Sequence, residues 1–269
     1  MFDFASIVKR TPWYNFHSHT QFCDGRATMA QFAEAAARAG FEHYGFTPHS
    51  PVPVDSPCNM KADDVPTYLA EVKRLQELYP QVRFYTSMEI DCLGDDWGPA
   101  SDYFQQLPLD YRLGSVHFVR ACDGSGPIDI DGSIDRFRRN MVTHFNNDLR
   151  YVAETYFQTE IDMLRAGGLD LLAHCDKIAQ NGAVYDPQLE SYDWYRDCVD
   201  ALIDAIVDSG VAVEINTKHM ASMNRLFPAP PVIDRLRRRG VTLVVNSDAH
   251  YTDLINANRM TVINRTTLH

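Results

Sequence analysis

The sequence predicts an α/β protein whose strands close into a barrel of seven strand–helix units. Seven short apolar runs, each bounded by turn signals, alternate with longer amphipathic stretches, which is the pattern of β–α units around parallel strands. Seven units in 269 residues fit a β/α barrel better than an open doubly wound sheet, which has fewer strands and a glycine-rich first turn. That glycine-rich turn is absent from this sequence. Because no Ser/Gly/Pro-rich linker divides the chain, we expect residues 1–269 to form a single domain.

Taken in order, the apolar runs give the expected strands and the amphipathic stretches give the expected helices. The strands span residues 15–20, 43–49, 82–91, 111–119, 169–176, 211–217 and 241–250. The helices span residues 29–39, 63–78, 133–166, 194–209 and 232–239. Gly40, Gly210 and Gly240 directly follow three of these helices and mark their ends. The stretch 133–166 is too long for one ordinary helix, so we expect two there, whereas residues 256–269 give no clear assignment.

Composition excludes several classes of protein. Hydrophobic residues make up 45% of the chain and charged residues 23%, as in ordinary globular proteins. The formal net charge of −11 disfavours broad nucleic-acid binding, because such a surface repels polyanions on average. No apolar run approaches the roughly 18 residues that a membrane helix needs, and the first residues do not resemble a secretory signal. We therefore expect a cytoplasmic protein with six reduced cysteines, and the sequence leaves its oligomeric state open.

Polar side chains stand at the carboxyl end of every predicted strand. Barrel active sites are built at this end of the strands, so these residues are candidates for a functional site. Alternate residues of a strand point to the same face, so pairs such as His17 and His19 can aim two side chains into the barrel mouth. In chain order the candidates are His17, His19, His49, Glu89, His117, His174, Glu214, Asn216, Asp248 and His250.

These residue types favour a metal centre. A single histidine near a strand end is more often a hydrogen-bonded core residue than a ligand, but that explanation does not account for such residues on all seven strands. Histidine and carboxylate ligands without thiolates suit zinc, manganese or iron(II), and a carboxylate such as Glu89 can bridge two ions. Because more than four ligands are available, the sequence predicts a multinuclear site.

Six short motifs, in order, resemble those of the PHP (polymerase and histidinol phosphatase) family. The first is His17-Ser18-His19-Thr20 followed by Cys23-Asp24-Gly25, and the second is Thr47-Pro48-His49-Ser50-Pro51. Ser115-Val116-His117-Phe118 is similar to the form found in histidinol-phosphate phosphatases. The set is completed by Ala173-His174-Cys175-Asp176, Glu214-Ile215-Asn216-Thr217 and Ser247-Asp248-Ala249-His250. The resemblance extends from about residue 13 to residue 252.

The resemblance implies a distorted seven-stranded barrel that holds three divalent metal ions. By position, one ion would be held by His17, His19, Glu89 and Asp248. A second ion, bridged to the first, would be held by Glu89, His117 and His174. The third would be held by Asp24, His49 and His250. Some members have a histidine at the position of Gly25, so the third site depends on the aspartate variant of the motif.

The implied reaction is phosphate monoester hydrolysis, with histidinol phosphate as the expected substrate and histidine biosynthesis as the setting. A metal-bridging hydroxide would attack the phosphorus while the ions neutralise the phosphate oxygens. His250 or His219 is the candidate acid that protonates the leaving group, and Asp248 should be essential for turnover. No motif indicates a nucleophilic serine or cysteine.

Candidate substrate contacts follow strands five and six. They are Lys177, Lys218, Arg225, Glu214 and Asn216. Relatives that act on histidinol phosphate have arginines in these regions, and lysine binds phosphate as a point charge rather than as a bidentate fork. The acidic loop 91–96 can attract a cationic substrate, although an ordinary solvated loop explains it as well, and Phe118, Tyr156 and Phe227 are possible pocket walls.

Two alternatives stay open at this point. One is a PHP-family phosphoesterase for another small phosphate ester or a nucleotide. The other is a barrel that binds metal or a partner without catalysis. The intact ligand set speaks against the second, because loss of function would tolerate substitutions at these positions.

Overall fold

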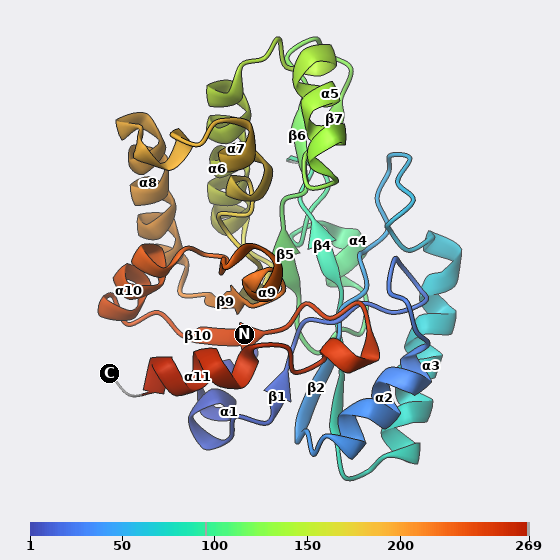
Figure 1. Ribbon diagram of the computed structural model, residues 1–269. Helices are drawn as coiled ribbons and strands as arrows, with labels where there is room; N and C mark the ends of the chain where they lie inside the picture. The colour runs from blue at the N-terminus through green and yellow to red at the C-terminus, as the bar shows by residue number, and fades with distance from the viewer. Residues whose placement is uncertain (95, 268–269) are drawn as a thin grey trace.

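The computed structural model describes residues 1–94 and 96–267 of the chain and shows parallel strands surrounded by helices (Figure 1). One sheet has the order β1-β2-β3, formed by Tyr14–Asn15, His43–Phe46 and Arg83–Thr86. A second sheet has the order β10-β9-β8-β5-β4, formed by Leu243–Asn246, Ala212–Asn216, Leu171–Leu172, Leu113–Ser115 and Glu89–Asp91. Every pair within these two sheets is parallel. The predicted α/β class with parallel strands is therefore confirmed.

The two sheets meet at two joints, which we call the sheet seams. At the first seam, Ser18 after β1 bridges Ala249 after β10. At the second seam, His49 after β2 bridges Glu89, the first residue of β4. The strands thus form a distorted barrel in which β3 and β4 are two halves of one bent strand.

Two predicted strands are interrupted in the structure. The strand expected at 82–91 breaks at Ser87 and Met88, because its first half pairs with β2 and its second half pairs with β5. The strand expected at 111–119 ends at Ser115, and β6 (Phe118–Arg120) instead forms an antiparallel ribbon with β7 (Pro127–Asp129). Both breaks lie next to predicted metal ligands, so they turn the chain where those side chains enter the site.

The predicted helices are present within one to a few residues of the expected bounds. They are α2 (Met29–Arg38), α3 (Val65–Leu78), α8 (Asp193–Ser209) and α10 (Pro230–Arg238). The stretch 133–166 is two helices, α5 (Ile134–His144) and α6 (Leu149–Ala166), as expected. Asn146 and Asn147 lie between them with φ of 50° and 58°, a left-handed conformation that asparagine tolerates and that ends α5.

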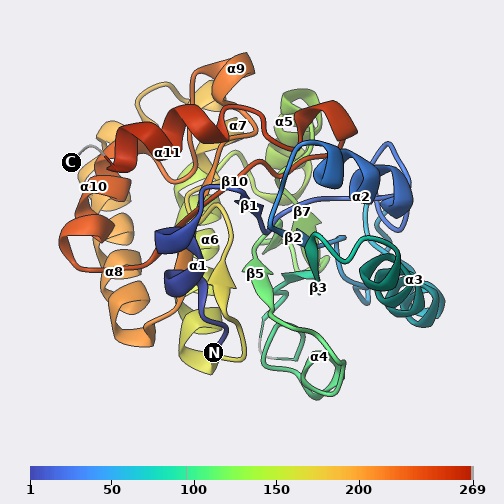
Figure 2. The same ribbon diagram turned by 90° about the horizontal axis from the view of Figure 1, so that it is seen from below.

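Several shorter helices were not predicted. They are α1 (Phe4–Arg10), α4 (Asp102–Gln105), α7 (Ala179–Tyr185), α9 (Met220–Met223) and α11 (Arg259–Thr267). Helices α2 and α3 cover one side of the barrel, and α6 and α8 cover the opposite side (Figures 1 and 2). No helix in the described part of the chain is long and apolar enough to cross a bilayer.

Aromatic side chains fill the barrel interior below the predicted site. Phe4, Phe16, Tyr85 and Tyr111 are buried in one cluster, with ring centroids 5.0–6.4 Å apart for the pairs in contact. The Tyr111 hydroxyl donates to the Phe16 carbonyl at 2.7 Å, which satisfies its polar end. This packing fills one end of the barrel, and the cavity lined by the predicted site residues lies at the other end, above the carboxyl ends of the strands.

Helix α11 follows the last strand and begins with a fully buried arginine. Arg259 Nε donates to the Val245 carbonyl at 3.0 Å, and a second nitrogen donates to Asn256 Oδ1 at 2.9 Å. Its guanidinium lies 4.9 Å from the ring centroid of Tyr14 and 5.4 Å from that of Phe41. Arg259 therefore connects β10 to the segment around β1, close to the first sheet seam.

Candidate metal centre

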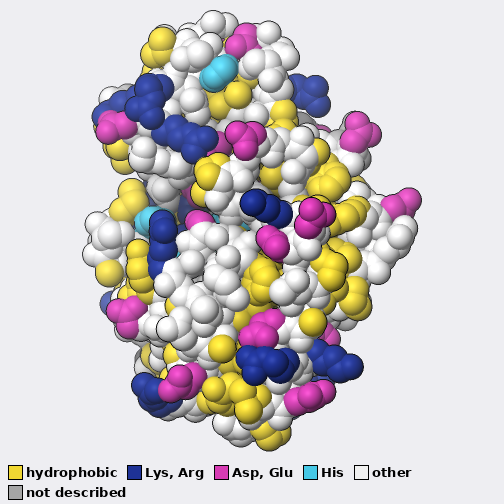
Figure 3. All heavy atoms as spheres, turned by 90° about the vertical axis from the view of Figure 1, so that its right-hand side faces the viewer, with side chains coloured by type: hydrophobic (Ala, Val, Ile, Leu, Met, Phe, Trp, Pro, Cys, Tyr) yellow, Lys and Arg dark blue, Asp and Glu magenta, His cyan; other side chains and the backbone are white. Residues whose placement is uncertain are grey.

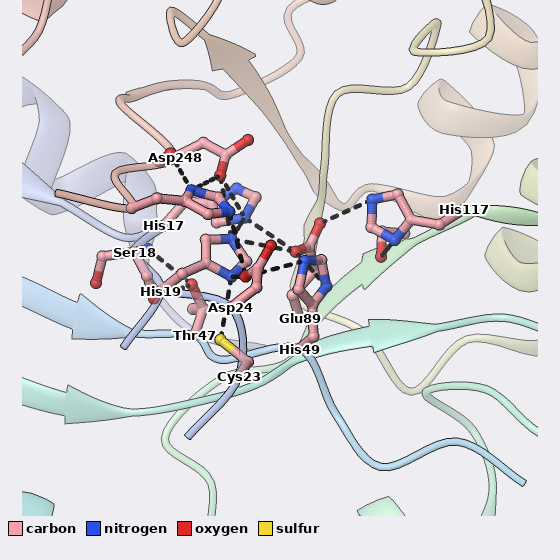
Figure 4. A network of polar contacts seen from close by, with 12 residues as sticks. His17, Ser18, His19, Cys23, Asp24, Thr47, His49, Glu89, His117 and Asp248 are labelled. Carbon is pink, nitrogen blue, oxygen red and sulfur yellow. Dashed lines mark hydrogen bonds and ion pairs between the residues drawn. The ribbon is translucent and has the colours of Figure 1, made fainter. Parts of the chain in front are cut away.

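The predicted ligands converge at the carboxyl ends of the strands, and Figure 4 shows seven of them pointing toward one another. His17 and His19 follow β1, while Asp248 and His250 follow β10 across the first seam. His49 follows β2 and faces Glu89 across the second seam. His117 and His174 complete the ring from the ends of β5 and β8.

The first predicted set closes tightly around Glu89 and Asp248. Glu89 Oε2 lies 3.2 Å from His17 Nε2 and 3.4 Å from His19 Nε2. Asp248 Oδ1 lies 3.1 Å from His19 Nε2 and 3.7 Å from His17 Nε2. Asp248 reaches this position with φ of 49°, a left-handed conformation that aspartate adopts more readily than most residues.

The second set uses the other oxygen of Glu89. Glu89 Oε1 lies 2.9 Å from His174 Nε2 and 3.5 Å from His117 Nε2. Glu89 therefore faces two groups of histidines with two different oxygens. This is the arrangement that a bridging carboxylate requires.

The third set lies nearest the opening of the site. Asp24 Oδ1 is 3.3 Å from His250 Nε2 and 3.9 Å from His49 Nε2. A Cβ atom on Gly25 would lie 2.3 Å from the backbone nitrogen of Thr20, so no side chain fits at that position. The turn thus favours Asp24 over a neighbouring histidine as the donor.

The donor groups fit a divalent metal ion. Neighbouring ligands of a tetrahedral zinc ion lie about 3.3 Å apart when each bond is about 2.0–2.1 Å, and the nitrogen–oxygen distances in the first two sets scatter around this value. Asp24 Oδ1 and His49 Nδ1 are buried without a hydrogen-bond partner among the described residues. Four overlapping groups of three or four donors meet here.

Carboxylates behind the ligands orient the histidine rings. His17 Nδ1 donates to Glu214 Oε1 at 2.7 Å, and His117 Nδ1 donates to Asp91 Oδ1 at 2.7 Å. Asn216 Nδ2 donates to Asp248 Oδ2 at 3.0 Å. Partners of this kind fix the tautomer and direction of a metal-binding ring. Glu214 and Asn216, which we expected among the substrate contacts, are fully buried and lie behind the ligands instead.

The electrostatics of the site show a concentration of negative charge. Burial lowers the pKa of His117, but Asp91 and Glu89 outweigh it and raise the pKa to about 10. Burial likewise opposes protonation of His17, whose pKa is nevertheless raised by Glu214, Glu89 and Asp248. A bound cation can supply the positive charge that these protons otherwise provide, and metal binding should release protons.

A cavity of about 420 Å³ opens above these ligands. Figure 3 shows histidine side chains in a hollow of this face, with Lys or Arg beside them. Lys177, Lys218 and His219 line the cavity, as we expected of residues that meet the substrate or act in catalysis. Lys218 Nζ lies 3.3 Å from Asp248 Oδ1 and 3.3 Å from His250 Nε2.

Arg225, by contrast, does not line the cavity. Its guanidinium makes two 2.8 Å hydrogen bonds to the carboxylate of Glu190 and lies 5.1 Å from the ring centroid of Phe227. The structure therefore gives Arg225 a partner that competes with any substrate. Tyr156 and Phe227 are fully buried outside the cavity wall, whereas Phe118 lies in that wall.

His219 lines the cavity in a form unsuited to donating a proton near neutral pH. Burial, assisted by Lys177 and Lys218, lowers its pKa to about 4. At pH 7 the ring is neutral and can accept a hydrogen bond. Of the two candidate acids, His219 is therefore the less suited.

The acidic loop after β4 contributes only its first residue to the cavity. Asp91 lines the cavity but accepts hydrogen bonds from His117 and Asn59, and Asp96 is exposed outside it. Asp95 lies outside the described residues. The sequence did not single out Asp129 of β7, Asp131 of the following turn or Arg136 of α5, which also line the cavity, because they belong to no metal-ligand motif.

Fold and site together define a β/α barrel with a multinuclear set of metal donors at the carboxyl ends of its strands. The sequence profile of the PHP domain matches residues 15–218 of this chain. The chain therefore belongs to the PHP domain family, as its motifs indicated.

Relatives of known name agree with this assignment. The chain is 28% identical over 246 residues to a Deinococcus radiodurans protein named "Probable histidinol-phosphatase", covering 87% of this chain and 85% of that one. It is 23% identical over 260 residues to the histidinol-phosphatase of Bacillus subtilis, covering 87% and 92%.

Solved structures with the same fold come from bacterial proteins. A Listeria monocytogenes protein superposes with a TM-score of 0.79 at 16% identity, covering 92% of this chain and 99% of that chain. A histidinol phosphate phosphatase from Lactococcus lactis, crystallised with Zn, L-histidinol and phosphate, superposes with a TM-score of 0.68 at 16% identity. The alignment with the second structure covers 95% of this chain and 93% of that chain.

Proposed function

We propose that this chain is a metal-dependent phosphomonoesterase, and specifically an L-histidinol-phosphate phosphatase of histidine biosynthesis in the cytoplasm. The observation that carries the proposal is the ring of histidines and carboxylates below a cavity that also contains two lysines. The names of the D. radiodurans and B. subtilis relatives support histidinol phosphate as the substrate.

Three divalent ions are proposed, bound by the three sets described above. The donors fit zinc, manganese or iron(II). Such ions supply an activated water and neutralise phosphate charge at neutral pH. Glu89 holds two of the sets together, and Glu214 and Asp91 keep His17 and His117 in the orientation that presents Nε2 to the site.

The remaining steps are assigned to the residues of the cavity. Lys218 and Lys177 attract the phosphate dianion and help to hold it above the donor ring. His250 is the candidate acid for the leaving oxygen, since it lies at the opening of the site on the same side as Lys218. In that role His250 would leave the third ion to Asp24 and His49, because a metal-bound ring nitrogen has no proton to donate. The aromatic floor and the buried ligands exclude bulk water from below.

The proposal is tested by metal analysis together with hydrolysis of a panel of phosphate monoesters that includes histidinol phosphate. We expect bound zinc, manganese or iron and phosphate release that is fastest from histidinol phosphate. If the metal-loaded protein releases phosphate from none of the esters, the phosphatase proposal is wrong. If another ester is preferred by orders of magnitude, only the substrate is wrong.

Substitution of ligands gives the first prediction for the site. His17→Ala and Asp248→Ala should each lower the metal content and reduce turnover at least a hundredfold, because His17 belongs to two of the donor groups and Asp248 is the carboxylate of one of them. Circular dichroism should show a folded barrel in both. His144→Ala is the matched control, since His144 lies on α5 outside the cavity. Near-normal turnover in either ligand variant contradicts the assigned site.

A further inference from the structure

The cavity wall contains carboxylates that belong to none of the proposed metal sets. Asp91, Asp129 and Asp131 line the same cavity as the proposed ligands. Asp129 ends β7, and Asp131 lies two residues later in the turn that leads to α5. Asp131 Oδ2 lies 3.6 Å from Nζ of Lys177, a proposed phosphate contact, so Asp131 is within reach of the group attached to that phosphate.

Two of the three carboxylates are already satisfied. Asp91 accepts hydrogen bonds from His117 Nδ1 at 2.7 Å and from Asn59 Nδ2 at 3.0 Å. Asp129 accepts from the backbone nitrogens of Asp131 and Gly132, and its other oxygen pairs with Arg136 at 3.0 Å. In both carboxylates each oxygen therefore already has a partner.

Asp131 is different, because none of the described residues donates a hydrogen bond to its side chain. Its backbone nitrogen is fixed by Asp129 Oδ1 at 2.8 Å, so the position of the residue is set by the turn. Its nearest charge is Lys177, whose Nζ lies 3.6 Å from Asp131 Oδ2, beyond normal hydrogen-bond distance. Desolvation opposes ionisation, but Lys177 and the neighbouring histidines keep the pKa of Asp131 below its usual value.

Lys177 is the second unsatisfied group in this wall. Its side chain is only 3% exposed, yet no described residue accepts a hydrogen bond from its ammonium, which otherwise lies 5.4 Å from the ring centroid of Phe227. An ammonium has three donors, and burying it without acceptors is costly. A phosphate oxygen would satisfy it, and Asp131 would then lose its charge partner.

We propose that Asp131 binds a positively charged nitrogen of the leaving group, so that the cavity selects phosphate monoesters that also carry an ammonium or imidazolium. When a zwitterionic ligand binds, the ion pair between Lys177 and Asp131 is replaced by two ion pairs with the ligand. The phosphate pairs with Lys177, and the cation pairs with Asp131. An ester without the cation leaves an ionised carboxylate unpaired in the cavity. This inference rests on the proposed phosphatase function and names the determinant of its specificity.

The test uses phosphonates, which bind without being hydrolysed. Isothermal titration of the metal-loaded protein compares 2-aminoethylphosphonate with propylphosphonate and 3-aminopropylphosphonate with butylphosphonate, so each pair is matched in length and differs in the terminal cation. We expect the amine of at least one pair to bind at least tenfold more tightly, and Asp131→Asn to reduce that ratio to near one. Asp131→Lys should reverse the preference, so that 3-phosphonopropanoate binds more tightly than 3-aminopropylphosphonate.

Asp135→Asn is the matched control, because it removes an exposed carboxylate from the adjoining turn of α5 outside the cavity. It should keep the wild-type ratio. Equal binding within both pairs, or a ratio unchanged in Asp131→Asn, overturns the inference. Because binding is measured without turnover, this result is independent of whether the protein hydrolyses phosphate esters.

Discussion

Lys218 combines a partly exposed side chain with a position directly beside two proposed metal ligands. Its ammonium is 3.3 Å from Asp248 Oδ1, and the pKa of Lys218 is raised because Asp248, Asp131 and other carboxylates outweigh the effect of burial. The side chain is therefore charged at neutral pH. It can attract a phosphate while its carboxylate partner, Asp248, serves as a proposed metal ligand.

Replacing this lysine gives a second prediction. Lys218→Ala should raise KM for histidinol phosphate about tenfold, the equivalent of about 1.4 kcal/mol of lost binding, and lower kcat much less. Steady-state kinetics with the metal content of each sample measured will separate binding from loss of metal. Lys73→Ala, an exposed lysine of α3, is the control. An unchanged KM would show that Lys218 does not contribute to substrate binding.

Glu160 is a buried carboxyl that the proposed mechanism does not use. It lies on the inner face of α6, and neither of its oxygens has a hydrogen-bond partner among the described residues. Burial raises its pKa to about 8. The folded state therefore prefers the protonated acid, whereas the unfolded chain ionises near its ordinary value.

The third prediction concerns the pH dependence that follows from this shift. The pKa of Glu160 is higher in the folded state than in the unfolded chain. The free energy of unfolding is therefore highest below about pH 4.5, and it falls as the pH rises to about 8. Glu160→Gln should therefore be more stable than wild type by up to about 3 kcal/mol at pH 7, with little difference at pH 4.5. Urea unfolding at both pH values measures this. A stability difference that does not grow with pH contradicts the assignment.

Single residues show why the ligands were predictable and their supporting partners were not. Histidines and carboxylates at strand ends follow from the two-residue repeat of a strand, which says which side chains face the barrel interior. The repeat does not say how deep a side chain lies, so Glu214 looked like a substrate contact although it is buried beneath His17. Arg225 was misjudged because Glu190 is 35 positions away in sequence.

Among the secondary-structure elements, the long strands and helices were predictable and the breaks were not. Strand β3 ends before Ser87 and β4 begins after Met88. Both of these residues are buried like the strands beside them, so the sequence pattern does not mark the break. Only the change of pairing partner, from β2 to β5, reveals it. Helix α11 was missed because its first residue is a buried arginine, which reads as a surface position in sequence.

That arginine provides the fourth prediction. Arg259→Met should lower the free energy of unfolding by about 3 kcal/mol, because it leaves the carbonyl oxygens of Val245 and Pro12 and the side-chain oxygen of Asn256 without this donor. Arg265→Met, at an exposed position of the same helix, should cost less than about 0.5 kcal/mol. Denaturant unfolding of the two variants makes the comparison. Equal losses would show that helix α11 as a whole, rather than the Arg259 guanidinium, provides the stability.

The molecule as a whole is held together at its sheet seams by few backbone hydrogen bonds. At the first seam the His19 nitrogen donates to Ala249, and at the second the Ser50 nitrogen donates to Glu89. Four overlapping donor groups span these seams, so an ion bound there connects the two sheets.

Metal removal is the fifth prediction. Chelation should lower Tm by several degrees and accelerate hydrogen exchange at the His19 and Ser50 amides at least tenfold. The Val213 amide, which donates to Thr242 within the larger sheet, should change much less. Hydrogen exchange followed by NMR or mass spectrometry compares the seam amides with the Val213 amide. Uniform acceleration across the chain would mean that the seams gain no special support from metal.

Because the proposed metal ligands lie at the seams, the rate at which the protein is degraded should depend on the supply of metal. Without a bound ion, few backbone hydrogen bonds would join the two sheets at the seams, and a protease would be expected to gain its first access to the backbone there. We therefore expect the amount of this protein in a cell to fall when divalent metal is scarce, before any loss of its synthesis. The residues that would hold the catalytic ions would then also determine how slowly the folded protein is degraded.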